Sequence, residues 1–152
     1  MPRSWRIAKS ARAATAFDGE GARLYGGRWN SPGTVVVYTA QTESLAALEL
    51  LVHLQASQLL MSYCSLPVDF DDALVEVVDP TSLPSDWRSS PAPSVLQQIG
   101  DRWAADHRSV VLQLPSAIVP REANFIINPR HPDFGSLSIG PPDSFDFDPR
   151  LE

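Results

Sequence analysis

The chain of 152 residues contains a single cysteine, Cys64. One thiol cannot form an internal disulfide, and a lone cysteine fits a protein kept in the reducing cytosol. Cys64 lies in the apolar run LLMSYCSLPV, which favours a buried small side chain over a reactive thiol. We therefore expect a cytoplasmic protein whose fold does not depend on disulfides.

Long apolar stretches and clusters of metal ligands are also missing. No run approaches the ~18 residues of a membrane span. The N-terminal MPRSWRIAKS lacks the apolar core of a secretory signal. Asp69, Asp71 and Asp72 lie close together, but this pattern is more typical of a solvated loop than of a coordination site. We expect no membrane association and no metal.

Positive charge is scarce, since the chain has 12 basic and 18 acidic residues and a net charge of −6. This balance excludes a general electrostatic grip on nucleic acid, so direct DNA binding is not expected. Eleven of the twelve basic residues are arginines, and Lys9 is the exception. Arginine suits bidentate contacts to phosphate or carboxylate, although a GC-rich genome produces the same bias.

Length and apolar content (43%) indicate one domain with a sizeable core. The patterns favour an α+β fold, a single compact domain in which helices pack on a mixed β-sheet. Ser94 and Gln97 have the spacing of a capping box at the start of the second helix. Strands are expected at residues 5–7, 34–40, 63–67, 73–78, 109–115 and 123–127, and helices at 42–57 and 94–105.

The regions outside these elements are expected to be irregular. Residues 10–27 are small, polar and glycine-rich, which predicts a loop or a mobile flap. From residue 140 the chain is acidic and proline-rich, so we expect a domain at 1–140 and a peripheral tail at 141–152. The helix from 42 to 57 is apolar nearly all round and is expected to be central.

The most informative stretch is residues 26–49, GGRWNSPGTVVVYTAQTESLAALE. Arg28 follows two glycines, Tyr38 ends a strand and Glu49 lies on a helix. Each has an ordinary structural explanation: an ion pair for Arg28, a core aromatic for Tyr38, and a pair with His53 or simple exposure for Glu49. Together, on consecutive elements, they suggest a cleft.

Five motifs occur in order: GGRWNSPG, VVYTA, LAALELLVH, LPSAIVP and NFIINPRHPDF. This series resembles the RES domain family, the toxins of bacterial Xre–RES toxin–antitoxin pairs. The resemblance extends from Trp5 to Phe134. It implies a fold similar to the ADP-ribosyltransferases of the diphtheria-toxin kind and an enzyme that acts on NAD.

The resemblance also implies site residues. Glu49, Arg28 and Tyr38 would be catalytic, with the carboxylate stabilising positive charge on the ribose and the tyrosine stacking on nicotinamide. Ser116 and Asn30 would position the ribose or the amide by neutral hydrogen bonds, and a cap at the end of a strand is the alternative role of Ser116. The NAD-binding set would be Arg6, Arg28, Asn30, Tyr38, Ser116 and Asn128, with the two arginines on the pyrophosphate.

The implied reaction is cleavage of the nicotinamide–ribose bond of NAD by hydrolysis or phosphorolysis, which would deplete NAD and arrest growth. The alternative is transfer of ADP-ribose to a host protein. No Gly-x-Gly-x-x-Gly motif is present, so NAD would be a substrate and no cofactor is expected. The implied partner is an Xre-family helix-turn-helix antitoxin that occludes the active site, and a toxin dimer is a family expectation.

Two other classes of function remain open at this point. A ribonuclease could use His53, His107 and His131 as acid and base, although the acidic balance of the chain opposes this. A non-catalytic interaction module would need none of these groups.

Overall fold

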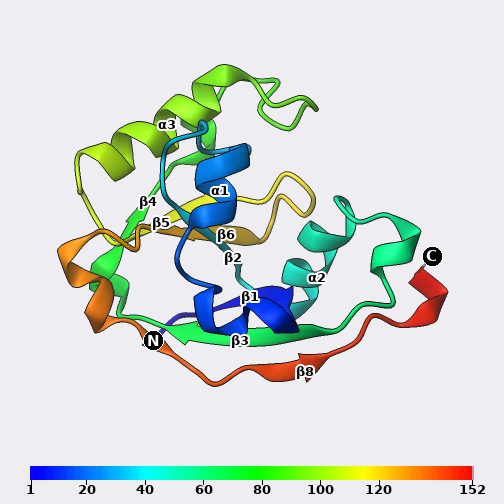
Figure 1. Ribbon diagram of the computed structural model, residues 1–152. Helices are drawn as coiled ribbons and strands as arrows, with labels where there is room; N and C mark the ends of the chain where they lie inside the picture. Colours follow the sequence, from blue (N-terminus) through cyan, green and yellow to red (C-terminus); the bar gives the residue numbers. More distant parts are fainter. Residues whose placement is uncertain (152) are drawn as a thin grey trace.

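The computed structural model describes residues 1–151 and shows one mixed sheet with helices on both faces (Figure 1). The three α-helices are α1 (Glu20–Tyr25), α2 (Glu43–Leu51) and α3 (Ser94–Ala105), and the 3-10 helices include η1 (Ser10–Thr15). The strands are β1 (Arg3–Lys9), β2 (Val37–Ala40), β3 (Tyr63–Asp69), β4 (Val75–Val77), β5 (Val111–Pro115), β6 (Ala123–Ile127), β7 (Ser138–Ile139) and β8 (Asp143–Phe145).

The strands are ordered β4-β5-β6-β2-β1-β3-β7, with β8 paired to β3. Only β4 and β5 run parallel among the described pairs, and the others are antiparallel. The predicted α+β class with a mixed sheet is therefore confirmed. Within residues 1–151, no helix is long and apolar enough to cross a membrane.

Two hydrophobic clusters lie side by side on one face of the sheet. The α3 cluster contains Trp29, Trp103 and Leu114 among others, and the α2 cluster contains Ile7 and Ala40 among others. We call the line between these clusters the seam. Figure 1 shows α1 and α3 on one side of β2 and α2 on the other. Two further clusters cover the opposite face, where η1 packs.

Helix α2 begins where the sequence predicts but ends at Leu51, six residues early. Thr42 caps it, because its Oγ1 accepts a hydrogen bond from Leu45 N at 3.0 Å. The expectation of a central helix was wrong: Leu48 is 40% exposed and Val52 61% exposed. The sheet covers one side of α2 only, so its remaining apolar residues face outward.

Helix α3 occupies residues 94–105 as predicted, but the capping box does not form. Gln97 Nε2 instead donates to Gly27 O at 3.1 Å and to Asn30 O at 3.2 Å. Gly100 lies against this same loop, since an added Cβ would come within 1.7 Å of Trp29 O. Helix α3 therefore holds the loop at residues 26–33 in place.

Two regions expected to be irregular are ordered elements. Residues 10–27 contain η1 and α1, so they are not a loop or flap. The segment after residue 140 adds β8 to the sheet opposite β3, and Phe147 is 6% exposed, with its ring 5.3 Å from that of Tyr63. A peripheral tail from residue 141 was therefore wrong up to Phe147, because apolar side chains at alternate positions reach the core. Residue 152 lies outside the described residues.

Candidate active site

Two of the predicted site residues, Glu49 of α2 and Ser116 after β5, are joined by a hydrogen bond. Ser116 Oγ donates to Glu49 Oε1 at 2.8 Å. The same Oγ accepts from Ile118 N and Val119 N, both at 3.1 Å, so Ser116 also caps the turn after β5. Ser116 is fully buried and Glu49 is half-buried. The cap at the end of β5 is confirmed, and the hydroxyl that forms it also orients Glu49. A direct contact from Ser116 to NAD stays a prediction.

The expected pair between Glu49 and His53 does not form in the described chain. His53 is exposed, and Glu49 Oε2 has no hydrogen-bond partner among residues 1–151. One carboxylate oxygen is therefore held by Ser116, and the other is free to accept a hydrogen bond or to face positive charge. A carboxylate fixed in this way can stabilise a nearby positive charge.

Tyr38 lies on the same face of the sheet, at the edge of the α3 cluster. Its hydroxyl donates to Asn30 Oδ1 at 2.5 Å and accepts from Trp29 N at 3.1 Å. Burial raises the pKa of Tyr38 well above its ordinary value, and the nearby positive charge of Arg28 opposes that shift. The hydroxyl is committed to the loop, so only the half-buried ring can contact a ligand.

Asn30 is fully buried, and its side chain is satisfied within the protein. Its Nδ2 donates to the carbonyl oxygens of Ala22, Ser31 and Thr34, while its Oδ1 accepts from Tyr38. A direct contact from Asn30 to a substrate was therefore the wrong expectation. Its hydrogen bonds fix the shape of the loop that carries Arg28.

Arg28 is half-buried, and its guanidinium binds backbone instead of a carboxylate. Nη1 donates to Trp87 O at 2.9 Å and to Ser89 O at 3.0 Å. None of the ion pairs in residues 1–151 includes Arg28, so the ion pair considered as its structural role does not form. The charge of Arg28 is thus uncompensated by any carboxylate beside it and remains available to an anion.

Arg6 does not share the face of Glu49. Side chains alternate along a strand, so Arg6 projects on the same side as Ser4, whose Oγ accepts from Thr39 Oγ1 at 2.7 Å. Its Nη1 donates to Tyr38 O at 3.1 Å, its Nε is buried without a partner, and burial lowers its pKa. A pyrophosphate clamp shared by Arg6 and Arg28 was therefore wrong, because the sheet separates them.

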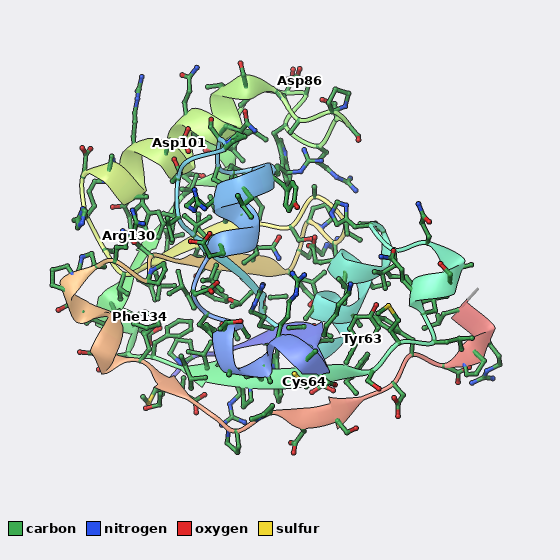
Figure 2. The ribbon with its side chains drawn as sticks, in the orientation of Figure 1. Tyr63, Cys64, Asp86, Asp101, Arg130 and Phe134 are labelled. Carbon is green, nitrogen blue, oxygen red and sulfur yellow. The ribbon has the colours of Figure 1, made fainter. Side chains whose placement is uncertain are left out.

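Asn128 lies at the opposite end of β6 from Ser116. Its Nδ2 donates to Ala104 O and its Oδ1 accepts from Arg130 N. Figure 2 shows Arg130 at one end of the molecule and Tyr63, close to α2, toward the other. The expectation that Asn128 binds substrate at the same site as Glu49 was wrong for this reason.

The asparagine that reaches the seam is Asn124, which sequence reasoning missed. In register it pairs with Ala40 of the α2 cluster and with Leu114 of the α3 cluster, so all three share one face. Its Nδ2 donates to Thr39 O at 3.3 Å, and its Oδ1 has no hydrogen-bond partner among the described residues. The sequence feature that could have pointed to Asn124 is the motif NFIINP, because it contains two asparagines at opposite ends of one strand.

The three histidines do not form one site. His107 and His131 stack with ring centroids 6.2 Å apart, at the end of the sheet where Asn128 lies. Both ring nitrogens of His131 are used, since Nδ1 accepts from Asp133 N and Nε2 contacts His107 O. His53 lies in the turn after α2, remote from the other two histidines. The acid–base arrangement that a ribonuclease needs is not present.

Two hollows on the surface lie away from Glu49 and contain none of the site residues. One, of about 190 Å³, is lined by Val95, Ile99 and Arg108 among others; the second, of about 320 Å³, by Arg3, Gln113 and Phe125 among others. Neither brings together uncompensated charge and a free carboxylate. The seam is the better candidate because Glu49, with a free carboxylate oxygen, and Asn124, with a free amide oxygen, lie on the face of the sheet that also carries Tyr38.

The fold therefore defines an α+β protein in which a serine-bound carboxylate and an arginine-bearing loop lie on the same face of the sheet. The RES domain family model matches residues 3–148, and the chain belongs to that family. A protein from Yersinia enterocolitica named Toxin Res is 41% identical over 149 residues, covering 97% of this chain and 98% of the relative. The Prs ADP-ribosylating toxin of Sphingobium sp. is 40% identical, covering 97% and 94%.

A solved structure supports the fold. The crystal structure of the MbcT-MbcA toxin–antitoxin complex of M. tuberculosis matches with a TM-score of 0.78. The match covers 99% of this chain and 86% of the other, at 24% sequence identity. The resemblance to the RES family expected from the five motifs is thus confirmed.

Proposed function

We propose that this protein is the toxin of a toxin–antitoxin pair and that it cleaves NAD at the nicotinamide–ribose bond. The observation that carries the proposal is the pairing of Glu49 with Ser116, which leaves one carboxylate oxygen free on the face of the sheet shared with Tyr38. The names of the full-length relatives, which are toxins, support the toxin role.

The chemistry follows from the charge that develops during cleavage. As the C–N bond breaks, its electron pair leaves with nicotinamide, which becomes neutral, and the ribose C1′ acquires oxocarbenium character. The Glu49 carboxylate stabilises this cation, because a fixed negative group in a partly buried setting needs little reorganisation. Water or phosphate then attacks C1′, and the attacking oxygen loses its proton.

Other residues of the seam would bind the rest of NAD. The ring of Tyr38 offers a flat apolar surface to nicotinamide, and the free Oδ1 of Asn124 can accept from an amide or a ribose hydroxyl. Arg28 supplies uncompensated positive charge for the pyrophosphate. In this proposal NAD is the substrate and no other cofactor takes part.

The same site supports transfer of ADP-ribose to a protein, and the name of the Sphingobium relative favours this second candidate. The two reactions share the bond that breaks and differ only in the acceptor. Which acceptor is used depends on what reaches C1′ after nicotinamide departs.

A partner is part of the proposal. An antitoxin that covers the seam would prevent cleavage of NAD in the cytoplasm of the host, and the structural neighbour is a toxin–antitoxin complex by title. We propose an Xre-family antitoxin, to which DNA binding would belong. A toxin dimer inside that complex is part of the same proposal.

The test is incubation of the purified protein with NAD, with and without phosphate, followed by analysis of the products. Release of nicotinamide with ADP-ribose indicates hydrolysis, and ADP-ribose 1″-phosphate indicates phosphorolysis. If NAD stays intact and a protein in lysate becomes labelled, the function is ADP-ribosylation of a target protein and not depletion of NAD. Intact NAD and no labelled protein under any condition would overturn the enzymatic proposal.

A further inference from the structure

Arg88, on the loop at residues 84–93 before α3, carries a second uncompensated guanidinium, which is anchored next to the serine that binds Glu49. Its Nε donates to Ala117 O at 2.9 Å, and Ala117 follows Ser116 directly. Figure 1 shows the β5–β6 loop, in yellow, between α2 and the loop that precedes α3. Arg88 thus bridges the two loops within one residue of the serine that orients Glu49.

Arg28 holds Arg88 from the other side. Its Nη1 donates to the carbonyl oxygens of Trp87 and Ser89, the residues on either side of Arg88 in the chain. Two contacts from one nitrogen therefore fix the backbone from which the Arg88 side chain extends. The carbonyls point at Arg28, so they are not left to satisfy the guanidinium of Arg88.

The terminal nitrogens of Arg88 have no acceptor within the described part of the chain. Only Nε is used, which leaves four N–H donors in the fixed fork of the guanidinium. None of the ion pairs in residues 1–151 includes Arg88. Asp86, the nearest acidic residue in sequence, is at the outer edge of the molecule in Figure 2. An exposed but anchored guanidinium without a carboxylate is suited to an anionic ligand.

We infer that Arg88 binds the diphosphate of the dinucleotide beside Arg28, which also positions the loop that carries Arg88. This inference rests on the proposed function. A dinucleotide whose ribose C1′ faces Glu49 must place its diphosphate close by along the seam. The anchored Nε sets the plane of the fork, so its two terminal nitrogens meet phosphate oxygens at low entropic cost.

The experiment compares Arg88→Ala, Arg88→Gln and Arg88→Lys with the wild-type protein. We expect the KM for NAD to rise about 10- to 100-fold in the Ala and Gln variants, with a smaller change in kcat, because a lost charge-assisted bond weakens ground-state binding. Lysine should retain part of the affinity as a point charge. Arg12→Ala, an exposed arginine of η1 on the opposite face, is the matched control and should leave KM unchanged.

Direct binding separates this inference from the proposed reaction. ADP-ribose is titrated calorimetrically into Glu49→Gln and into the double variant Glu49→Gln with Arg88→Ala, at low and high salt. We expect the double variant to bind at least about tenfold more weakly at low salt and to show a smaller salt dependence, because one of the two arginines assigned to the diphosphate is gone. Equal affinity in the two proteins overturns the role of Arg88, whether or not the wild-type protein cleaves NAD.

A purely structural bridge would behave differently. If Arg88 only joins the two loops, its removal should lower the melting temperature and kcat while KM and ADP-ribose affinity stay the same. That result also overturns the inference. Wild-type protein that binds ADP-ribose through Arg88 but leaves NAD intact would support the binding role and contradict the proposed function.

Discussion

Ser116 Oγ lies 2.8 Å from Glu49 Oε1, so two residues 67 positions apart in the chain share one hydrogen bond. The bond joins α2 to the turn after β5. Because Ser116 also accepts from two backbone N–H groups, its hydroxyl proton can point only toward the carboxylate. The orientation of Glu49 is therefore set by the strand end opposite it.

Glu49→Gln should abolish most of the proposed activity while the protein stays folded. The amide keeps the shape and can still accept from Ser116, but it carries no charge to stabilise the ribose cation. We expect nicotinamide release to fall at least about 100- to 1,000-fold. Glu43→Gln is the control on the same helix, since Glu43 Oε2 accepts from Ser65 at 3.2 Å, away from the seam. Full activity in Glu49→Gln would rule out the carboxylate mechanism.

Ser116→Ala should reduce both stability and kcat. The substitution leaves the N–H groups of Ile118 and Val119 without their acceptor and releases Glu49. Loss of such buried bonds costs about 1–3 kcal/mol of unfolding free energy, and we expect kcat to fall more than affinity for NAD. Urea unfolding and steady-state kinetics measure the two effects. An unchanged kcat in a destabilised protein would limit Ser116 to its capping role.

Tyr38→Phe should destabilise the loop at residues 26–33 and change the response to alkaline pH. The phenol of Tyr38 bonds Asn30 and Trp29, and burial raises its pKa in the folded state. A raised pKa contributes stability that is present below the unfolded value of about 10 and is lost as pH rises toward the folded value. The excess in free energy of unfolding of the wild-type protein over Tyr38→Phe should therefore shrink above pH ~10.

Tyr25→Phe, at an 83% exposed position, is the control. A constant difference between pH 8 and 11 would contradict this.

Gly100→Ala should weaken the attachment of α3 to the Arg28 loop. The added Cβ would lie 1.7 Å from Trp29 O, so helix and loop must move apart. Overpacking of this kind costs about 1–3 kcal/mol, and we expect a loss of proposed activity as Arg28 shifts. Gly21→Ala, in α1, meets no atom within 4 Å and serves as control. Equal melting temperatures for the two variants would refute the close approach.

Asn124 and Asn128 should give opposite results when each is changed to alanine. Asn124 offers a free Oδ1 to the seam, so Asn124→Ala should lower kcat/KM by about 10-fold or more. Asn128 bonds Ala104 O and Arg130 N within the protein, so Asn128→Ala should lower stability and leave kcat/KM intact. If instead Asn128→Ala lowers kcat/KM and Asn124→Ala does not, Asn128 and not Asn124 binds the substrate.

Local patterns were sufficient for much of the fold. The β-branched and alternating runs predict the positions of β3, β5 and β6, and helix α3 occupies the predicted residues. The ordered motifs led to the RES family, and two of the residues that the resemblance implied, Glu49 and Ser116, share a hydrogen bond that the sequence did not predict. These features depend on residues near one another in the chain or on a pattern shared with relatives.

The positions of several side chains depend on contacts between distant parts of the chain, which the sequence alone does not show. Gln97 binds the loop at residues 26–33 in place of its own helix end, and Phe147 packs in the core from a segment that composition alone describes as a tail. Arg88 gains its position from Arg28, 60 residues earlier, and from Ala117, 29 residues later.

The sequence by itself located the strands β1 to β6, the helices α2 and α3 and the family, but it missed α1, β7 and β8. Only the folded sheet decided which of two arginines, Arg6 or Arg28, and which of two asparagines share a face with Glu49. The reason is the pleat and register of β-strands: a side chain's face depends on which residues lie opposite it, and those partners come from distant parts of the chain.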